Sequence, residues 1–252
     1  MRLKGRTVLI TGASSGFGAH FSRIVADAGG RVVLAARRVD RIAALRDELA
    51  ASGAEAVAVA MDVTDEASVR AAYDAAEARF GTIDTIIANA GVSGPGRSTD
   101  VPVAALRGVL DTNVLGLFLT VREGARRMIA AGSRETGRGR VLLVGSMAAV
   151  AHLPGEVMYC ASKAAVANLG RNFAREWVRQ GITVNVIQPG FVLTEMAADW
   201  FASPGGEKQI AGFPKGRLQP IGSLDEPVLF FCSDAAEAAT GAVLTIDDGQ
   251  SL

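Results

Sequence analysis

Short apolar runs alternate with longer amphipathic segments along the whole chain, and this alternation constrains the fold more than any other feature. The runs predicted as strands are residues 7–10, 31–36, 56–61, 84–88, 140–146, 182–188 and 242–246. Segments with helical apolar spacing lie between them, at 17–28, 39–51, 65–79, 103–131, 157–179 and about 225–234. Strands that are apolar on both faces suit a sheet buried between helices, and alternation implies parallel pairing through right-handed crossovers. The sequence therefore predicts a doubly wound α/β fold with a seven-stranded parallel sheet in three layers.

The length and composition of the chain suit one globular domain. Of its 252 residues, 49% are hydrophobic and 21% charged, so we expect residues 1–252 to form a single domain with a large core. One segment, residues 194–217, interrupts the alternation with Pro204, Pro214 and the aromatic Trp200. Long loops in compact domains are more often functional than idle, so we interpret this segment as a substrate flap. The alternative is a variable surface excursion.

Charge and cysteine content indicate a small-molecule partner. Basic and acidic residues number 26 each and form no long run, so the pattern favours neither nucleic acid nor a membrane as partner. Cys160 and Cys232 match no metal or redox spacing, which predicts reduced thiols and no metal site. A strand begins after six residues, leaving no room for a signal peptide, and we find no apolar run near the ~18 residues of a membrane span. We therefore expect a cytoplasmic protein.

Three glycines, Gly12, Gly16 and Gly18, follow the first predicted strand and open the next helix. Glycine there permits a tight turn, so that a pyrophosphate can bind the free N–H groups of a helix N-terminus. The spacing Gly-x-x-x-Gly-x-Gly differs from the commoner Gly-x-Gly-x-x-Gly. Because of its place between strand and helix, we predict a dinucleotide-binding loop. The alternative is a turn with a purely structural role.

The end of the second predicted strand distinguishes the two nicotinamide cofactors. A site for NAD(H) needs a carboxylate about 20 residues beyond the glycines to bind the ribose hydroxyls. Residues 28–39 contain no carboxylate, and Arg37 and Arg38 lie where the 2′-phosphate of NADP(H) would bind. Guanidinium groups bind phosphate through paired donors, so the sequence favours NADP(H) over NAD(H). The alternatives are that these arginines are surface charge and that Asp40 contacts the ribose.

Two further predicted strands end in residues that would line the same crevice. Asp62 ends the third strand, and Asn89, Ala90 and Gly91 end the fourth. Ligands in open α/β sheets bind beyond the carboxyl ends of the strands, so Asp62 could accept a hydrogen bond from an adenine amino group. Each of these residues alone is more typical of a cap or a turn.

Tyr159 and Lys163 are one helical turn apart on a predicted helix, with small residues between them. A nearby ammonium favours phenolate, so we expect Lys163 to lower the pKa of Tyr159 from ~10 toward neutrality. Such a phenol can exchange a proton with a carbonyl or alcohol oxygen. Ser146, at the end of the fifth predicted strand, can hold that oxygen as charge develops. The alternative is an ordinary surface pair on a helix.

Short motifs that match one family follow in order along almost the whole chain. They are TGASSGFG at 11–18, DV at 62–63, NAG at 89–91, NVLG at 113–116, GS at 145–146, YCASK at 159–163, N at 185 and PGFVLT at 189–194. The chain resembles the short-chain dehydrogenase/reductase family, of the single-domain type. The resemblance implies a Rossmann-type fold and hydride transfer between a nicotinamide cofactor and a carbonyl or alcohol carbon.

The resemblance also implies roles for individual residues. Tyr159 matches the general acid/base, and Lys163 the residue that lowers its pKa and binds the nicotinamide ribose. Ser146 matches the residue that positions the substrate oxygen, and Asn113 the one whose backbone holds a water in a proton relay. A helix kink or a capping side chain is the structural alternative for Asn113. The expected cofactor-binding residues are Gly12, Ser14, Ser15, Gly16, Phe17, Gly18, Arg37, Arg38, Asp62, Val63, Asn89, Ala90, Gly91, Tyr159, Lys163, Pro189, Gly190, Val192 and Thr194.

The candidate substrate wall is largely apolar. This composition predicts a hydrophobic or bulky ketone or secondary alcohol, closed over by the flap. The same Met and aromatic residues could instead be core. The candidate wall residues are Ser146, Met147, His152, Leu153, Tyr159, Phe191, Met196 and Trp200.

Two residues depart from the family pattern. Ser15 lies where many NADP-using relatives carry Arg or Lys, and Asp248 replaces one of a usual pair of glycines near the C-terminus. That region commonly forms a tetramer interface in relatives, so we expect a homo-oligomer, a tetramer or a dimer. Two alternatives stay open: an NAD-dependent dehydrogenase of the same family and a non-catalytic dinucleotide sensor. An epimerase or dehydratase is disfavoured, because it would need a larger C-terminal domain than 252 residues allow.

Overall fold

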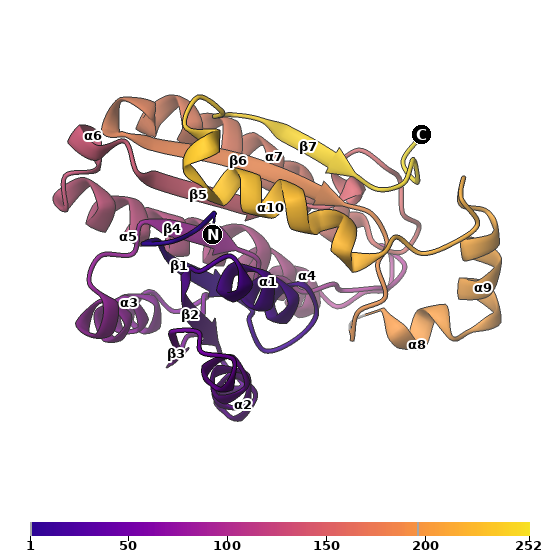
Figure 1. The fold of residues 1–252 in the computed structure, drawn as a ribbon. Helices are drawn as coiled ribbons and strands as arrows, with labels where there is room; N and C mark the ends of the chain where they lie inside the picture. The colour runs from indigo at the N-terminus through magenta and orange to yellow at the C-terminus, as the bar shows by residue number, and fades with distance from the viewer. Residues whose placement is uncertain (1, 196) are drawn as a thin grey trace.

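The seven predicted strands form one sheet in the computed structural model, which describes residues 2–195 and 197–252 (Figure 1). All neighbouring strands are parallel, in the order β3-β2-β1-β4-β5-β6-β7. The predicted fold class is confirmed. The strands are β1 (Thr7–Thr11), β2 (Arg31–Ala36), β3 (Ala56–Ala60), β4 (Thr85–Ala88), β5 (Gly139–Val144), β6 (Ile182–Pro189) and β7 (Val243–Ile246).

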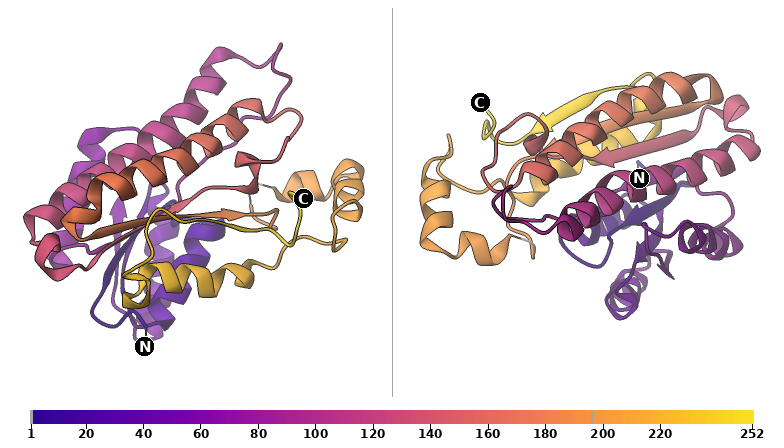
Figure 2. Two further views of the ribbon diagram at one scale, coloured as in Figure 1. Left: turned by 90° about the horizontal axis from the view of Figure 1, so that it is seen from above. Right: turned by 180° about the vertical axis from the view of Figure 1, so that it is seen from behind.

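Helices cover both faces of the sheet (Figure 2). Consecutive strand residues point to opposite faces, and apolar side chains on both faces are buried against helices. Val33 and Ile86 pack with α3, α5 and α7, whereas Val32 and Ile87 pack with α1, α2 and α10. The helices are α1 (Gly16–Asp27), α2 (Val39–Ala51), α3 (Glu66–Phe80), α4 (Val103–Leu110), α5 (Leu117–Ala130), α6 (Ser133–Thr136), α7 (Val157–Trp177), α8 (Ala198–Phe201), α9 (Pro204–Ala211) and α10 (Asp225–Cys232).

The helix predicted over 103–131 is divided by a π-helical segment, η1 (Asp111–Gly116), between α4 and α5. A π turn inserts one residue into the helix, and such turns occur frequently at functional sites. The stretch Val103–Ala130 is long and apolar enough to cross a membrane by length and composition, which corrects the expectation that no such run exists. Leu117 and Val121 of α5 are nevertheless buried against the sheet, and core helices meet the same criterion.

The flap predicted over 194–217 contains two short helices, α8 and α9. Pro204 begins α9, and the Ser203 hydroxyl accepts a hydrogen bond from the Gly206 N–H, which caps the helix. Both helices lie beyond the carboxyl end of the sheet and apart from the main layers (Figures 1 and 2). At this edge lies the point between β1 and β4 where the strand order reverses, the usual place for a ligand in a doubly wound sheet.

Candidate active site

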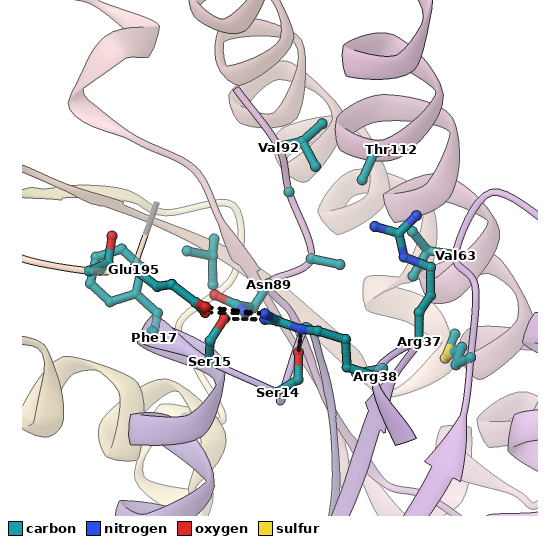
Figure 3. A pocket seen from close by; sticks show the side chains of 18 of the residues that line it. Ser14, Ser15, Phe17, Arg37, Arg38, Val63, Asn89, Val92, Thr112 and Glu195 are labelled. Carbon is teal, nitrogen blue, oxygen red and sulfur yellow. Dashed lines mark hydrogen bonds and ion pairs between the residues drawn. The ribbon is translucent and has the colours of Figure 1, made fainter. Parts of the chain in front are cut away.

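A cavity of about 480 Å³ opens at the carboxyl edge of the sheet, where β1, β2, β3, β4 and β5 end (Figure 3). Many of the predicted cofactor residues line it: Gly12, Ser14, Ser15, Gly16, Phe17, Arg37, Arg38, Asp62, Val63, Asn89, Ala90, Gly91, Tyr159, Lys163 and Thr194. Several further lining residues are not among those predicted from the sequence: Ala36, Met61, Val92, Thr112, Val144, Gly145 and Glu195. Most of these are chain neighbours of predicted residues, so extending each strand end by one residue would have found them.

Four predicted cofactor residues do not line this cavity: Gly18, Pro189, Gly190 and Val192. A Cβ on Gly18 would lie 2.2 Å from the Gly12 carbonyl oxygen, so glycine is required for α1 to approach the loop. A Cβ on Gly190 would lie 2.5 Å from Oε1 of Gln250, which shows that Gly190 packs against the C-terminal tail. These two glycines therefore allow close packing of the segments around the cavity and do not line it.

The glycine loop is held against the end of β4. Gly12 has a φ of +68°, and a Cβ there would lie 3.0 Å from Nδ2 of Asn89. The Thr11 hydroxyl accepts hydrogen bonds from the N–H groups of Asn89 and Ala90, each at 3.0 Å. The Asn89 amide donates to the Thr11 carbonyl at 2.9 Å. Asn89 thus joins two strand ends, as the turn alternative for it proposed, and also lines the cavity.

Asp62 caps the turn that follows β3. Its carboxylate accepts hydrogen bonds from the N–H and the hydroxyl of Thr64, at 3.0 and 2.8 Å. These bonds, with a smaller contribution from the charge of Arg37, hold the pKa of Asp62 below its usual range. Asp62 is therefore ionised at neutral pH and lies on the cavity wall as an acceptor.

The two arginines at the end of β2 differ in their contacts. Arg38 donates to the hydroxyls of Ser14 and Ser15, at 3.0 and 2.6 Å, and forms an ion pair with Glu195. The Arg37 side chain points away from these groups, toward Val63 and Thr112 in Figure 3. No side-chain hydrogen bond of Arg37 is found within residues 2–195 and 197–252, so its guanidinium donors stay available to a ligand of the cavity.

Tyr159 and Lys163 lie on one face of α7 and reach the inner end of the cavity. The Lys163 ammonium donates to the Val144 carbonyl at 3.0 Å and lies 5.6 Å from the centroid of the Tyr159 ring. Burial without a carboxylate partner lowers the pKa of Lys163 to about 8. Burial also raises the pKa of Tyr159, against a smaller opposite effect of the nearby Ser146.

The expectation that Lys163 lowers the pKa of Tyr159 is therefore wrong for this structure. Desolvation of the buried phenol is the largest effect on its pKa, and the opposite effect of Ser146 is smaller. Ser146 also differs from its predicted place, because β5 ends at Val144 and Ser146 caps a short 3-10 helix, η2 (Met147–Ala149). Its hydroxyl accepts from the Ala148 N–H at 3.1 Å, and its proximity to the Tyr159 phenol opposes the rise in the pKa of that phenol.

Asn113 lies in the π-helical segment with its side chain buried. Its amide accepts from the Val92 N–H at 2.8 Å and donates to the Val92 carbonyl at 2.9 Å and to the Ser162 hydroxyl at 3.0 Å. The side chain thus joins η1, the loop after β4 and α7. This agrees with the structural alternative for Asn113, and its backbone role stays a prediction.

Most of the predicted substrate residues are not brought together. Of the seven that lie within the described residues, Tyr159 alone lines the cavity, while Met147 is buried, His152 exposed and Leu153 half-buried. Phe191 packs against the flap aromatics Phe201 and Phe213, with ring centroids 5.5 Å apart in both pairs. The Trp200 indole is 53% exposed and donates to Gln209 at 2.6 Å. Met196 lies outside the described residues.

Pro189 to Thr194 connect β6 to the flap. The Thr194 side chain lies 3.6 Å from the position that a Cβ on Gly16 would occupy, so it packs over the glycine loop and lines the cavity. Val192 is buried. In the described part of the chain, no group of three or more His, Cys, Asp or Glu residues could hold a metal ion.

Comparisons with known proteins agree with this geometry. A family model described as short chain dehydrogenase matches residues 6–205. The chain is 38% identical to cis-4-hydroxycyclohexanecarboxylate dehydrogenase of Sinomonas cyclohexanicum, over 97% of this chain and 96% of that protein. It is 34% identical to D-threitol dehydrogenase of Mycolicibacterium smegmatis, over 100% and 95%. The crystal structure of a gluconate 5-dehydrogenase from Burkholderia cenocepacia, in complex with NADP and tartrate, superposes with a TM-score of 0.92 at 30% identity, covering 99% and 96% of the two chains.

Proposed function

This chain belongs to the short chain dehydrogenase family, and on that premise we propose that it transfers a hydride between NADP(H) and a hydrophobic or bulky ketone or secondary alcohol. It is an NAD(P)-dependent enzyme acting on CH–OH groups, as its relatives are. The observation that carries the proposal is that Tyr159 and Lys163 line the same cavity as the two arginines, Arg37 and Arg38, at the end of β2.

The cavity fits a nicotinamide dinucleotide. Gly12 leaves open the space that a side chain would fill beside Asn89, and Gly91 does so beside Lys163, where a Cβ would lie 3.5 Å from Nζ. The glycine loop and the N-terminus of α1 supply backbone donors for a pyrophosphate. When bound, the cofactor supplies or accepts the hydride. The arginine pair supports NADP(H) over NAD(H), because a 2′-phosphate would find paired donors there.

Proton transfer is assigned to Tyr159. Because burial raises its pKa, the phenol is protonated at neutral pH and can donate that proton to the oxygen of a ketone undergoing reduction. Ser146, beside the phenol, would hold the same oxygen. Lys163 would stabilise the phenolate left behind, and Asn113 would fix the π-helical segment and Val92 beside it.

The proposed substrate class is inferred from the residues at the edge of the sheet beyond this cavity. Three large apolar side chains are exposed there on segments that follow β5 and β6: Val150 at 61%, Leu193 at 61% and Trp200 at 53%. Such residues at the mouth of a site favour an apolar ligand covered by the flap. The named substrates of the relatives range from an open-chain polyol to a substituted ring, so those names do not narrow the class.

We also propose that the chain acts as a homo-oligomer, a dimer or a tetramer, in the cytoplasm. The support is an exposed apolar face on α4, η1 and α5 that includes Val103 and Leu115 at 63% and 47% exposure. Sedimentation velocity of the purified protein tests the assembly, and a monomer at micromolar concentration would contradict it.

A substrate panel tests the proposed reaction. Aryl and long-chain alkyl ketones, short ketoacids and the corresponding alcohols would be assayed with NADPH or NADH and with NADP⁺ or NAD⁺. We expect turnover of the apolar ketones with NADPH, and a reversal of cofactor preference in Arg37→Asp. Faster turnover of charged ketoacids, or a wild-type preference for NADH, would contradict the substrate or the cofactor assignment.

A further inference from the structure

The donors of Arg38, one of the two residues assigned to the 2′-phosphate, are already engaged within the protein. Its guanidinium donates to the hydroxyls of Ser14 and Ser15 and lies 3.2 Å from a carboxylate oxygen of Glu195. The same carboxylate lies 2.8 Å from the guanidinium of Arg41 on α2. Glu195 thus binds both arginines through its two oxygens, in the place where an anionic ligand would bind. Figure 3 shows its ion pair with Arg38 beside Ser14 and Ser15.

Glu195 comes from a distant part of the chain. It directly follows Thr194, which packs over the glycine loop, and it begins the flap segment that carries α8 and α9. The ion pairs therefore join the start of the flap to the end of β2 and the start of α2. The side chains of Glu195, Arg38 and Arg41 are 51%, 43% and 45% exposed, so the cluster can open without exposing buried charge.

We infer that Glu195 competes with the 2′-phosphate of NADP(H) for Arg38, and so determines how strongly the enzyme prefers NADP(H) to NAD(H). The inference rests on the proposed function, in which the arginines bind that phosphate. A phosphate monoester carries about −1.5 to −2 charges at neutral pH, so it is repelled by a carboxylate that shares its guanidinium. NAD(H) carries a neutral hydroxyl at this position and meets no such repulsion.

Two other roles for Glu195 give different binding patterns. A carboxylate that accepts hydrogen bonds from the adenosine ribose would strengthen NAD(H) binding, as the acidic residue at the end of β2 does in other dinucleotide sites. An ion pair that is only surface charge would leave both cofactors unaffected. The competition instead predicts that removal of the charge strengthens NADP(H) binding alone.

The experiment measures dissociation constants by calorimetry for NADPH, NADH and the fragment 2′,5′-ADP. The variants are Glu195→Gln, which keeps the shape of the side chain, Arg38→Gln, and Glu207→Gln as the matched control. Glu207 is an exposed carboxylate of the same flap, and no side-chain ion pair of it is found among the described residues. Circular dichroism and the midpoint of thermal unfolding would verify that each variant is folded.

We expect Glu195→Gln to lower the dissociation constants of NADPH and 2′,5′-ADP about five- to twentyfold, and to change the dissociation constant of NADH by less than about twofold. Glu207→Gln should match the wild type, and Arg38→Gln should weaken NADPH by about tenfold or more. Unchanged or weaker NADPH binding in Glu195→Gln, with the loss in Arg38→Gln retained, would overturn the competition and leave the cofactor assignment standing. Weaker NADH binding in Glu195→Gln would identify a ribose acceptor and overturn it too. If Arg38→Gln left NADPH binding unchanged, the phosphate site itself and the competition would both be wrong.

Discussion

Asp248 combines a strained backbone with a favourable charge environment, so substitutions there separate the two effects. It has a φ of +55°, in the left-handed region where a side chain is disfavoured, and it is the non-glycine residue with positive φ among those described. Its carboxylate pairs with Lys215 at 2.6 Å and Arg217 at 3.1 Å, which ties the end of the flap segment to the C-terminal tail. The pairs hold the pKa of Asp248 below its usual range, so both are present at neutral pH.

The expected changes in the free energy of unfolding rank three variants of Asp248 by stability. Asn keeps the tolerance of the left-handed conformation and removes the pairs, so Asp248→Asn should lower the free energy of unfolding by about 0.5–1.5 kcal/mol. Asp248→Ala loses the pairs and is less tolerant of positive φ, so we expect a loss of about 1–3 kcal/mol. Asp248→Gly loses the pairs and relieves the strain, and should remain within about 1 kcal/mol of the wild type.

Urea unfolding at neutral pH and low salt, followed by circular dichroism, measures these differences, provided that the m-values agree. The account predicts that Gly is more stable than Ala at this position by about 1 kcal/mol. Equal stability of the Gly and Ala variants would show that the backbone at Asp248 is not strained. A stability of Asp248→Asn equal to that of the wild type would show that the ion pairs contribute nothing.

Three further predictions follow from glycine packing and from the two pKa shifts of the active site. Gly18→Ala should destabilise the protein by roughly 2 kcal/mol or more and weaken NADPH binding, because its Cβ would lie 2.2 Å from a backbone oxygen. Gly108→Ala is the control: a Cβ there meets nothing within 4 Å, so this variant should be as stable as the wild type or more stable in urea unfolding. The chain has two tyrosines, and burial raises the pKa of both Tyr73 and Tyr159, so ultraviolet titration of the free protein should detect no phenolate below about pH 10; a phenolate that forms near neutrality and is lost in Tyr159→Phe would contradict this. The pKa of Lys163 is lowered to about 8, so its charge is present below pH 8 and lost as the pH rises through that value; kcat/KM for NADPH in ketone reduction should therefore fall above pH 8, and a level profile to pH 10 would oppose a role for the ammonium.

Periodicity was sufficient to predict the sheet and most of its helices, because strands buried on both faces and helices buried on one leave different apolar patterns. The division of the helix over 103–131 was not predictable in this way. The π turn forms where the Asn113 side chain bonds the backbone of Val92, a contact between segments 21 residues apart in the chain. Ser146 was likewise placed at a strand end, whereas the strand ends two residues earlier and Ser146 caps η2.

Within the site, motifs predicted the residues that line the cavity better than those that surround a substrate. Glycines and strand ends have fixed places in this fold, so Gly12, Asp62 and Asn89 lie where expected. The place of Glu195 depends on how the flap packs against β2, which no local pattern specifies, although its position directly after Thr194 was visible in the sequence. The predicted direction of the pKa shift of Tyr159 was wrong, because spacing along a helix indicates proximity to Lys163 but not how far burial desolvates the phenol.

The rate of ketone reduction in Tyr159→Phe, with NADPH affinity measured in the same preparation, tests the central claim most directly. Tyr73→Phe is the matched control, because the Tyr73 hydroxyl donates to the Thr120 carbonyl inside the core and lies outside the cavity lining. The account predicts that Tyr159→Phe loses about 100-fold or more in kcat while NADPH affinity changes by less than about threefold, and that Tyr73→Phe retains its kcat. Retention of most of the kcat by Tyr159→Phe would contradict the assignment of Tyr159 as the proton donor.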